Sequence, residues 1–137
     1  MKRRVYTAVL MAALSLLVVS CFKDKDERLD VSPEQVEGLW HKADNPYEYW
    51  RFNAGGTGVT WDETPDPLSG EPEMTEDLSN LKYSWSVDRD LLSFDWRGLM
   101  ENQDVPKYYY ISAISSSSMT WHDDYGLTYT LNKVAAR

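Results

Sequence analysis

A histidine beside two carboxylates is the motif in this 137-residue chain with the clearest chemical potential. His122 precedes Asp123 and Asp124, and a histidine oriented by an aspartate can act as a general base. No nucleophile motif such as Gly-x-Ser-x-Gly accompanies it. The chain has only 2 His and 1 Cys, too few to favour a His/Cys metal site. We expect His122 and His41 at the surface, and we predict no enzyme activity, no metal and no cofactor.

The single cysteine, Cys21, follows a segment with the features of a secretory leader. Lys2–Arg4 are basic, and Val5–Val19 form an uncharged, mostly apolar run that is short for a membrane span. The run ends in Leu17-Val18-Val19-Ser20-Cys21, which resembles the bacterial lipobox. The resemblance implies that residues 1–20 are cleaved and that Cys21 carries a diacylglycerol thioether and an amide-linked acyl chain such as palmitate. The alternative is a buried free cysteine.

The segment Phe22–Arg28 is charged and has little to bury, so residues 21–35 are expected to be a flexible tether and a short helical turn. The segment Phe22–Arg28 also resembles the Lys-and-acid signal of surface-exported lipoproteins of the Bacteroidetes type. The alternative is that this segment is only a solvated tether. Position 22 is Phe rather than Asp, which removes the common inner-membrane retention signal. We expect an outer-membrane lipid anchor, with periplasmic and cell-surface orientations both open. Several acyl chains hold a protein at a membrane stably without spanning it.

Charge and aromatic content exclude two classes of protein. The chain carries 22 acidic and 14 basic residues, a net charge of −8, which argues against a nucleic-acid partner. Cleavage before Cys21 would remove three basic residues and no acidic ones, leaving 117 residues with a net charge of −11. The 6 Trp and 9 Tyr give the chain enough apolar surface to fold, which argues against a disordered protein.

The folded part has the period-two pattern of half-buried strands. In Leu81–Val87 and Leu92–Trp96, apolar and polar residues alternate, and Arg89-Asp90 between them suits a turn. Upstream, Ser32–Gln35 is a short helix start with a capping box. The predicted strands are 39–43, 47–52, 58–61, 81–87, 92–96, 107–113, 119–122 and 127–131. Eight strands at this spacing predict an antiparallel all-β barrel or sandwich.

One predicted connection is long and acidic. Residues 62–80 contain seven Asp or Glu and no Lys or Arg, and Pro65, Pro67 and Pro72 oppose strand or helix. Loops of this length are often functional flaps or are disordered. No EF-hand spacing is present, so we expect a solvated loop rather than a calcium site.

The order of short motifs resembles the lipocalin-like domains of Bacteroidetes lipoproteins. The motifs are Gly38-Leu39-Trp40, Tyr49–Phe52, Gly55–Gly58, Tyr83–Trp85, Tyr110–Ser112 and Ser118–Trp121. The resemblance covers about residues 36–133 and implies an eight-stranded barrel with Trp40 packed across one end. The domain is short, and no helical pattern follows Leu131, so the family's ligand cavity is in question here. A small barrel can be filled by its own side chains.

The aromatic residues are the best candidates for binding. The apolar faces of two adjacent predicted strands carry Tyr83, Trp85, Phe94 and Trp96. These four side chains are expected to form either part of the core or the wall of a ligand site. Trp61 lies beside the acidic loop. Within Tyr108–Tyr110 at least one ring must face away from the core. Two hypotheses follow. The first is a lipid-anchored barrel that binds a small apolar or amphipathic ligand. The second is a filled barrel acting as an interaction or structural accessory for an unidentified protein or glycan.

Overall fold

The computed structural model describes residues 28–97 and 107–135. The predicted leader, Cys21 and the tether up to residue 27 lie outside this part. One short helix, α2 (Pro33–Val36), precedes all the strands. The strands are β1 (Gly38–Lys42), β2 (Asn45–Asn53), β3 (Thr57–Asp62), β4 (Lys82–Asp88), β5 (Leu91–Arg97), β6 (Tyr108–Ile114), β7 (Ser118–His122) and β8 (Thr128–Lys133).

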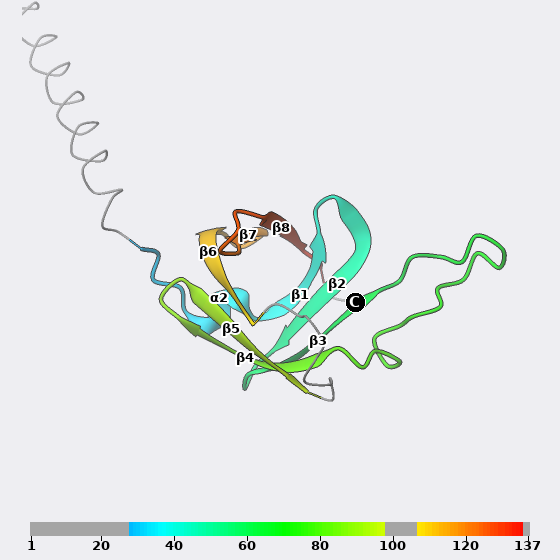
Figure 1. Ribbon diagram of the computed structural model, residues 1–137, viewed down its shortest axis with the longest axis horizontal. Coiled ribbons are helices and arrows are strands. Elements are labelled where there is room, and N and C mark those ends of the chain that lie inside the picture. Colours follow the sequence, from blue (N-terminus) through cyan, green and yellow to red (C-terminus); the bar gives the residue numbers. More distant parts are fainter. Residues whose placement is uncertain (1–27, 98–106, 136–137) are drawn as a thin grey trace, which may run out of the picture.

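The eight strands form a closed antiparallel barrel in which each strand pairs with its neighbours in sequence (Figure 1). Closure comes from β1, which pairs with β2 on one side and with β8 on the other. Trp40 is therefore opposite Trp50 in one ladder and opposite Lys133 in the other. The predicted all-β fold with eight antiparallel strands and a preceding helical turn is confirmed, and every strand boundary lies within two residues of its predicted position.

The alternating pattern of β4 and β5 explains why their aromatic side chains share one face of the sheet, as predicted. Tyr83 pairs with Trp96, and Trp85 pairs with Phe94. Successive side chains of a strand point to opposite faces, so all four rings share the inner face. Tyr83, Trp85 and Phe94 are buried there, and Trp96 is half-buried.

Helix α2 covers one end of the barrel, which we call the helix end; the turns 54–56, 89–90 and 115–117 lie at this end. Val36 and Trp40 are fully buried, and the Trp40 indole Nε1 donates to the Val36 carbonyl at 2.8 Å. The Lys133 ammonium lies 4.5 Å from the centre of the Trp40 ring, a cation–π contact. Trp40 is therefore packed between α2 and Lys133 at the helix end of the barrel.

The opposite end, called the loop end here, carries the connections 43–44, 63–81 and 123–127. The connection 63–81, hereafter the acidic arm, extends away from the barrel (Figure 1). It folds back on itself: Pro65 and Pro72 form an isolated antiparallel bridge, and the Asp66 amide donates to the Glu71 carbonyl at 2.8 Å. Its prolines limit regular pairing, as expected, but the arm has a defined hairpin form.

The chain enters the barrel at the helix end. The Val31 amide donates to the Arg89 carbonyl at 2.9 Å, and the Arg28 guanidinium is paired with the Asp90 carboxylate. Both partners belong to the β4–β5 turn. Residues that precede the barrel therefore attach on the side opposite the acidic arm.

Candidate functional site

The barrel interior is occupied by aromatic rings in mutual contact. Trp50 stands at the centre of this network, with ring centroids 5.3 to 6.5 Å from five neighbours. These neighbours are Phe52, Tyr83, Phe94, Trp96 and Trp121. Trp85 joins through Phe52 at 5.4 Å. The structure thus brings together four of the predicted candidates, as one packed core.

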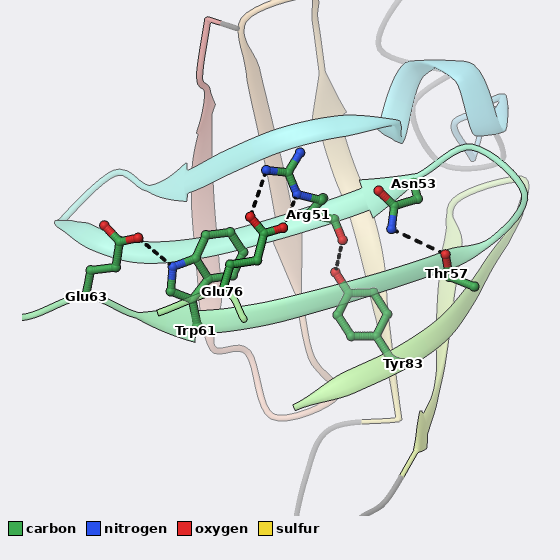
Figure 2. Close-up of polar contacts among 7 residues, drawn as sticks. All are labelled: Arg51, Asn53, Thr57, Trp61, Glu63, Glu76 and Tyr83. Atoms are coloured by element: carbon green, nitrogen blue, oxygen red, sulfur yellow. Dashed lines mark hydrogen bonds and ion pairs between the residues drawn. The ribbon is translucent and has the colours of Figure 1, made fainter. Parts of the chain in front are cut away.

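Most polar atoms of these rings already have partners in the barrel wall. The Tyr83 hydroxyl donates to the Arg51 carbonyl at 2.6 Å (Figure 2), and the Trp85 indole donates to the Thr57 carbonyl at 2.9 Å. Burial raises the pKa of Tyr83 well above its ordinary value, so the phenol stays neutral. Trp121 differs: its Nε1 is buried and has no hydrogen-bond partner within the described part of the chain.

Trp61, the fifth predicted candidate, is separate from this interior core. It is 3% exposed and lies in a second cluster with Leu39 and Val59, where its ring stacks on Tyr49 at 5.2 Å. The strand register explains the separation. Tyr49 precedes the inward-facing Trp50 on β2, so its side chain points outward. Trp61 on β3 is directly opposite Tyr49 and shares this outer face. Its Nε1 donates to the Glu63 carboxylate at 2.9 Å (Figure 2). Trp61 therefore packs at the root of the acidic arm.

Two further contacts hold the acidic arm against the barrel. Arg51 on β2 contacts both carboxylate oxygens of Glu76, with Nε–Oε2 at 2.5 Å and Nη2–Oε1 at 3.0 Å (Figure 2). Ser79 is 4% exposed and donates its hydroxyl to the Thr60 carbonyl at 2.6 Å. Sequence reasoning missed both contacts, because residues 25 and 19 positions apart are joined only by the fold.

The exposed large apolar side chains gather at the loop end and on the arm. Leu68 at the arm tip is 96% exposed, and Tyr125 in the β7–β8 turn is 93% exposed. The remainder of this group is Leu78, Leu127, Tyr47, Tyr108 and Met74. Only Leu29, among the exposed large apolar residues described, lies elsewhere. These residues are the large apolar side chains available for contact with a partner.

The turn that carries Tyr125 is built by the Asp123 side chain. Asp123 Oδ1 accepts hydrogen bonds from the amides of Tyr125 and Leu127, both at 2.9 Å. Gly126 has a φ of +83°, a conformation that suits glycine. The turn therefore has a defined conformation that leaves Tyr125 and Leu127 exposed. Sequence reasoning assigned this segment as a turn without identifying its exposed side chains.

Each histidine contacts a tyrosine ring and the backbone carbonyl of the following residue. His122 is half-buried; its ring stacks on Tyr110 at 5.5 Å, and its Nδ1 lies 3.2 Å from the Asp123 carbonyl rather than from a carboxylate. His41 is also half-buried, with its ring edge-on to Tyr49 at 6.5 Å. Within residues 28–97 and 107–135, no three His, Cys, Asp or Glu side chains converge on a metal-sized site.

The neighbouring tyrosines at the start of β6 divide between core and surface, as the sequence predicted. Tyr109 is 3% exposed and stacks on Trp121 at 4.8 Å. Tyr108 is 40% exposed, and its hydroxyl donates to the Asp124 carboxylate, which raises the pKa of Tyr108. One ring therefore completes the core while its neighbour belongs to the exposed group at the loop end.

The surface hollows lined by described residues include the following three. Two lie at the helix end: one of about 470 Å³ beside Gln35 and Ser115, and one of about 290 Å³ between α2 and Trp85. The third, of about 240 Å³, lies beside Lys82 and Arg97 on the outer wall. Two of them reach core rings from outside: Trp85 lines the hollow beside α2, and Tyr83 lines the one beside Lys82.

Comparisons with protein-family models, curated proteins and solved structures found no match for this chain. An eight-stranded closed barrel fits a lipocalin-like fold. Among the described residues, no helix has the length and apolar character needed to cross a membrane.

Proposed function

We propose that this protein is a lipid-anchored, non-enzymatic interaction lipoprotein whose lipocalin-like barrel is a filled scaffold. The observation that carries the proposal is the pairing of an occupied interior with an exposed apolar group at one end. Trp50 touches five aromatic neighbours inside the barrel, while Leu68 and Tyr125 are more than nine-tenths exposed outside it. A ring-filled interior favours contact through the outer surface.

The position of the tether supports a function at a distance from the membrane. Arg28 and Val31 attach at the helix end, and the acidic arm extends from the opposite end (Figure 1). An anchor at Cys21 would thus leave the loop end facing away from the lipid. Such an orientation offers Leu68, Tyr125 and Leu127 to a protein or glycan at the outer membrane.

A small apolar or amphipathic ligand is the second candidate function. Two observations favour it: Trp96 at the loop end of β5 is only half-buried, and the buried Nε1 of Trp121 lacks a partner within the described residues. A ligand with a hydrogen-bond acceptor could satisfy that group. Titration of the purified protein with fatty acids, haem and oligosaccharides, followed by Trp fluorescence, separates the candidates. A saturable response to one class supports ligand binding, and no response supports the filled scaffold.

The lipid anchor is tested through its attachment residue. Cys21→Ala removes the only thiol that could receive diacylglycerol. We expect the variant to leave the membrane fraction and to lose incorporation of labelled palmitate. Wild-type-like membrane association of Cys21→Ala would contradict the anchor.

The interaction surface is tested by photo-crosslinking in the producing cell. A photoreactive amino acid at Leu68 should give a discrete higher-mass adduct, because this side chain is 96% exposed at the arm tip. The matched control is the same amino acid at Ser86, which is exposed on the barrel wall at the other end. Absence of an adduct at Leu68, or equal adducts at both positions, would count against the proposal.

A further inference from the structure

The hollow on the outer wall of β3, β4 and β5 is rich in cations and hydrogen-bond donors. Its volume is about 240 Å³, and its lining residues are Asn53, Thr57, Gly58, Val59, Lys82, Tyr83 and Arg97. No carboxylate is among these lining residues of the described part of the chain. This composition is unusual for a chain with a net charge of −8.

Its two cations are direct cross-strand neighbours. Lys82 on β4 pairs with Arg97 on β5, and both side chains are exposed. Like charges at directly opposite positions of an antiparallel pair are destabilising. Neither forms an ion pair within the described chain, although Arg28, Lys42 and Arg51 each do. Asp95, on the same face of β5, forms no ion pair with them either.

Neighbouring groups orient the donors of this hollow. Arg97 donates through Nε and Nη2 to the Ser84 hydroxyl, at 3.1 and 2.7 Å, which holds the guanidinium along β4. The Asn53 side-chain amide donates to the Thr57 hydroxyl at 3.3 Å (Figure 2). The donors left for a ligand are one proton of that amide, the Thr57 hydroxyl proton, the Lys82 ammonium and the second terminal nitrogen of Arg97.

We propose that this hollow is a binding site for a small oxyanion, either a sulfate or a carboxylate group. An oxyanion between Lys82 and Arg97 would convert a repulsive cation pair into two charge-assisted interactions. Asn53 and Thr57 would supply hydrogen bonds to the same group or to hydroxyls attached to it. A hollow of about 240 Å³ that is open to solvent leaves room beside the anion for part of a sugar ring. This site does not depend on the loop end or on the lipid anchor.

The experiment is an NMR titration of the purified, ¹⁵N-labelled full chain. The probes are sodium sulfate and sodium glucuronate, with sodium chloride at equal ionic strength and neutral glucose as reference solutes. We expect saturable shifts of the Arg97 Nε–H and the Asn53 side-chain amide with the oxyanions and not with the reference solutes. Stronger binding of glucuronate than of sulfate would assign the anion to a saccharide, and the reverse order would assign it to the free ion.

Charge-removing variants give the second arm of the test. Lys82→Gln and Arg97→Gln should each weaken oxyanion binding by about tenfold, the effect of losing one charge-assisted hydrogen bond. Lys82→Gln should also leave the melting temperature unchanged or raised, because it relieves repulsion. The matched control is Lys107→Gln, which removes an exposed cation that does not line the hollow. Shifts that do not saturate, that chloride reproduces, or that Lys82→Gln leaves unchanged would overturn the site.

Discussion

Arg51 on β2 holds Glu76 of the acidic arm through two separate contacts, Nε to Oε2 at 2.5 Å and Nη2 to Oε1 at 3.0 Å. The planar guanidinium matches the two carboxylate oxygens, so the pair fixes direction as well as distance. Arg51 also offers its carbonyl to the Tyr83 hydroxyl from inside the barrel. One residue of β2 therefore links the aromatic core to the root of the exposed arm.

Glu76→Gln should loosen the arm with little effect on the barrel. About a third of each side chain is exposed, 30% for Arg51 and 35% for Glu76, so the pair contributes about 1 kcal/mol or less to the free energy of unfolding. We expect faster proteolysis within residues 63–81 and a nearly unchanged melting temperature. The control is Lys42→Gln, which removes a cation paired with Asp44 rather than with a residue of the arm. Equal proteolysis of Glu76→Gln and wild type would contradict this role.

Gly58→Ala should be strongly destabilising because the barrel wall has no room for a side chain there. An added Cβ would lie 2.3 Å from the Arg51 carbonyl oxygen and 2.3 Å from the Tyr83 ring. Overpacking of this kind costs about 1–3 kcal/mol or more in the free energy of unfolding, measurable by urea denaturation.

The informative control for Gly58→Ala is Gly55→Ala. At Gly55 an added Cβ would meet open space, but the backbone has a φ of +92°. Its substitution should cost only about 1 kcal/mol, through backbone strain alone. If Gly55→Ala is the more damaging change, steric exclusion at Gly58 is not the dominant effect.

Two fully buried tryptophans should respond differently to substitution by Phe. The Trp40 indole donates to the Val36 carbonyl at 2.8 Å and lies against the Lys133 ammonium, whereas Trp121 Nε1 has no partner in the described structure. Trp40→Phe leaves a buried carbonyl unpaired, so it should lose about 1–2 kcal/mol more stability than Trp121→Phe. Urea unfolding of the two variants measures this difference. Equal losses would show that the hydrogen bond to Val36 contributes little.

The free energy of unfolding should decrease at alkaline pH. Burial raises the pKa values of Tyr83 and Tyr109 above 10, the ordinary value for a tyrosine. Above about pH 10 the unfolded chain loses these phenolic protons while the folded chain keeps them. The free energy of unfolding then decreases by about 1.4 kcal/mol per pH unit for each such residue, whereas below the unfolded pKa the contribution is constant.

Tyr109→Phe provides the comparison for the alkaline prediction. It removes one of the two buried phenols, so urea unfolding between about pH 8 and about pH 11 should show a shallower decline than in wild type. Identical slopes for the two proteins would exclude Tyr109 as a source of the alkaline sensitivity.

Sequence pattern predicted the strands well because the period of a half-buried strand is local. The alternation in Leu81–Val87 and Leu92–Trp96 correctly assigned Tyr83, Trp85, Phe94 and Trp96 to one cluster. Trp61 could not be assigned in the same way, because β3 is buried on both faces from Gly58 to Trp61. Its outer position follows from register with Tyr49 and from cover at the arm root.

By itself, the sequence determined the all-β class, the number of strands and the helical turn, because hydrophobic period and turn residues act over short distances. Tertiary structure alone decided how the barrel closes, which places Lys133 against Trp40 across 93 positions of sequence. It also decided the contact of Arg51 with Glu76 and the pairing of Lys82 with Arg97 beside Asn53. These relationships depend on strand register and closure, and register is set by the packing of the whole barrel.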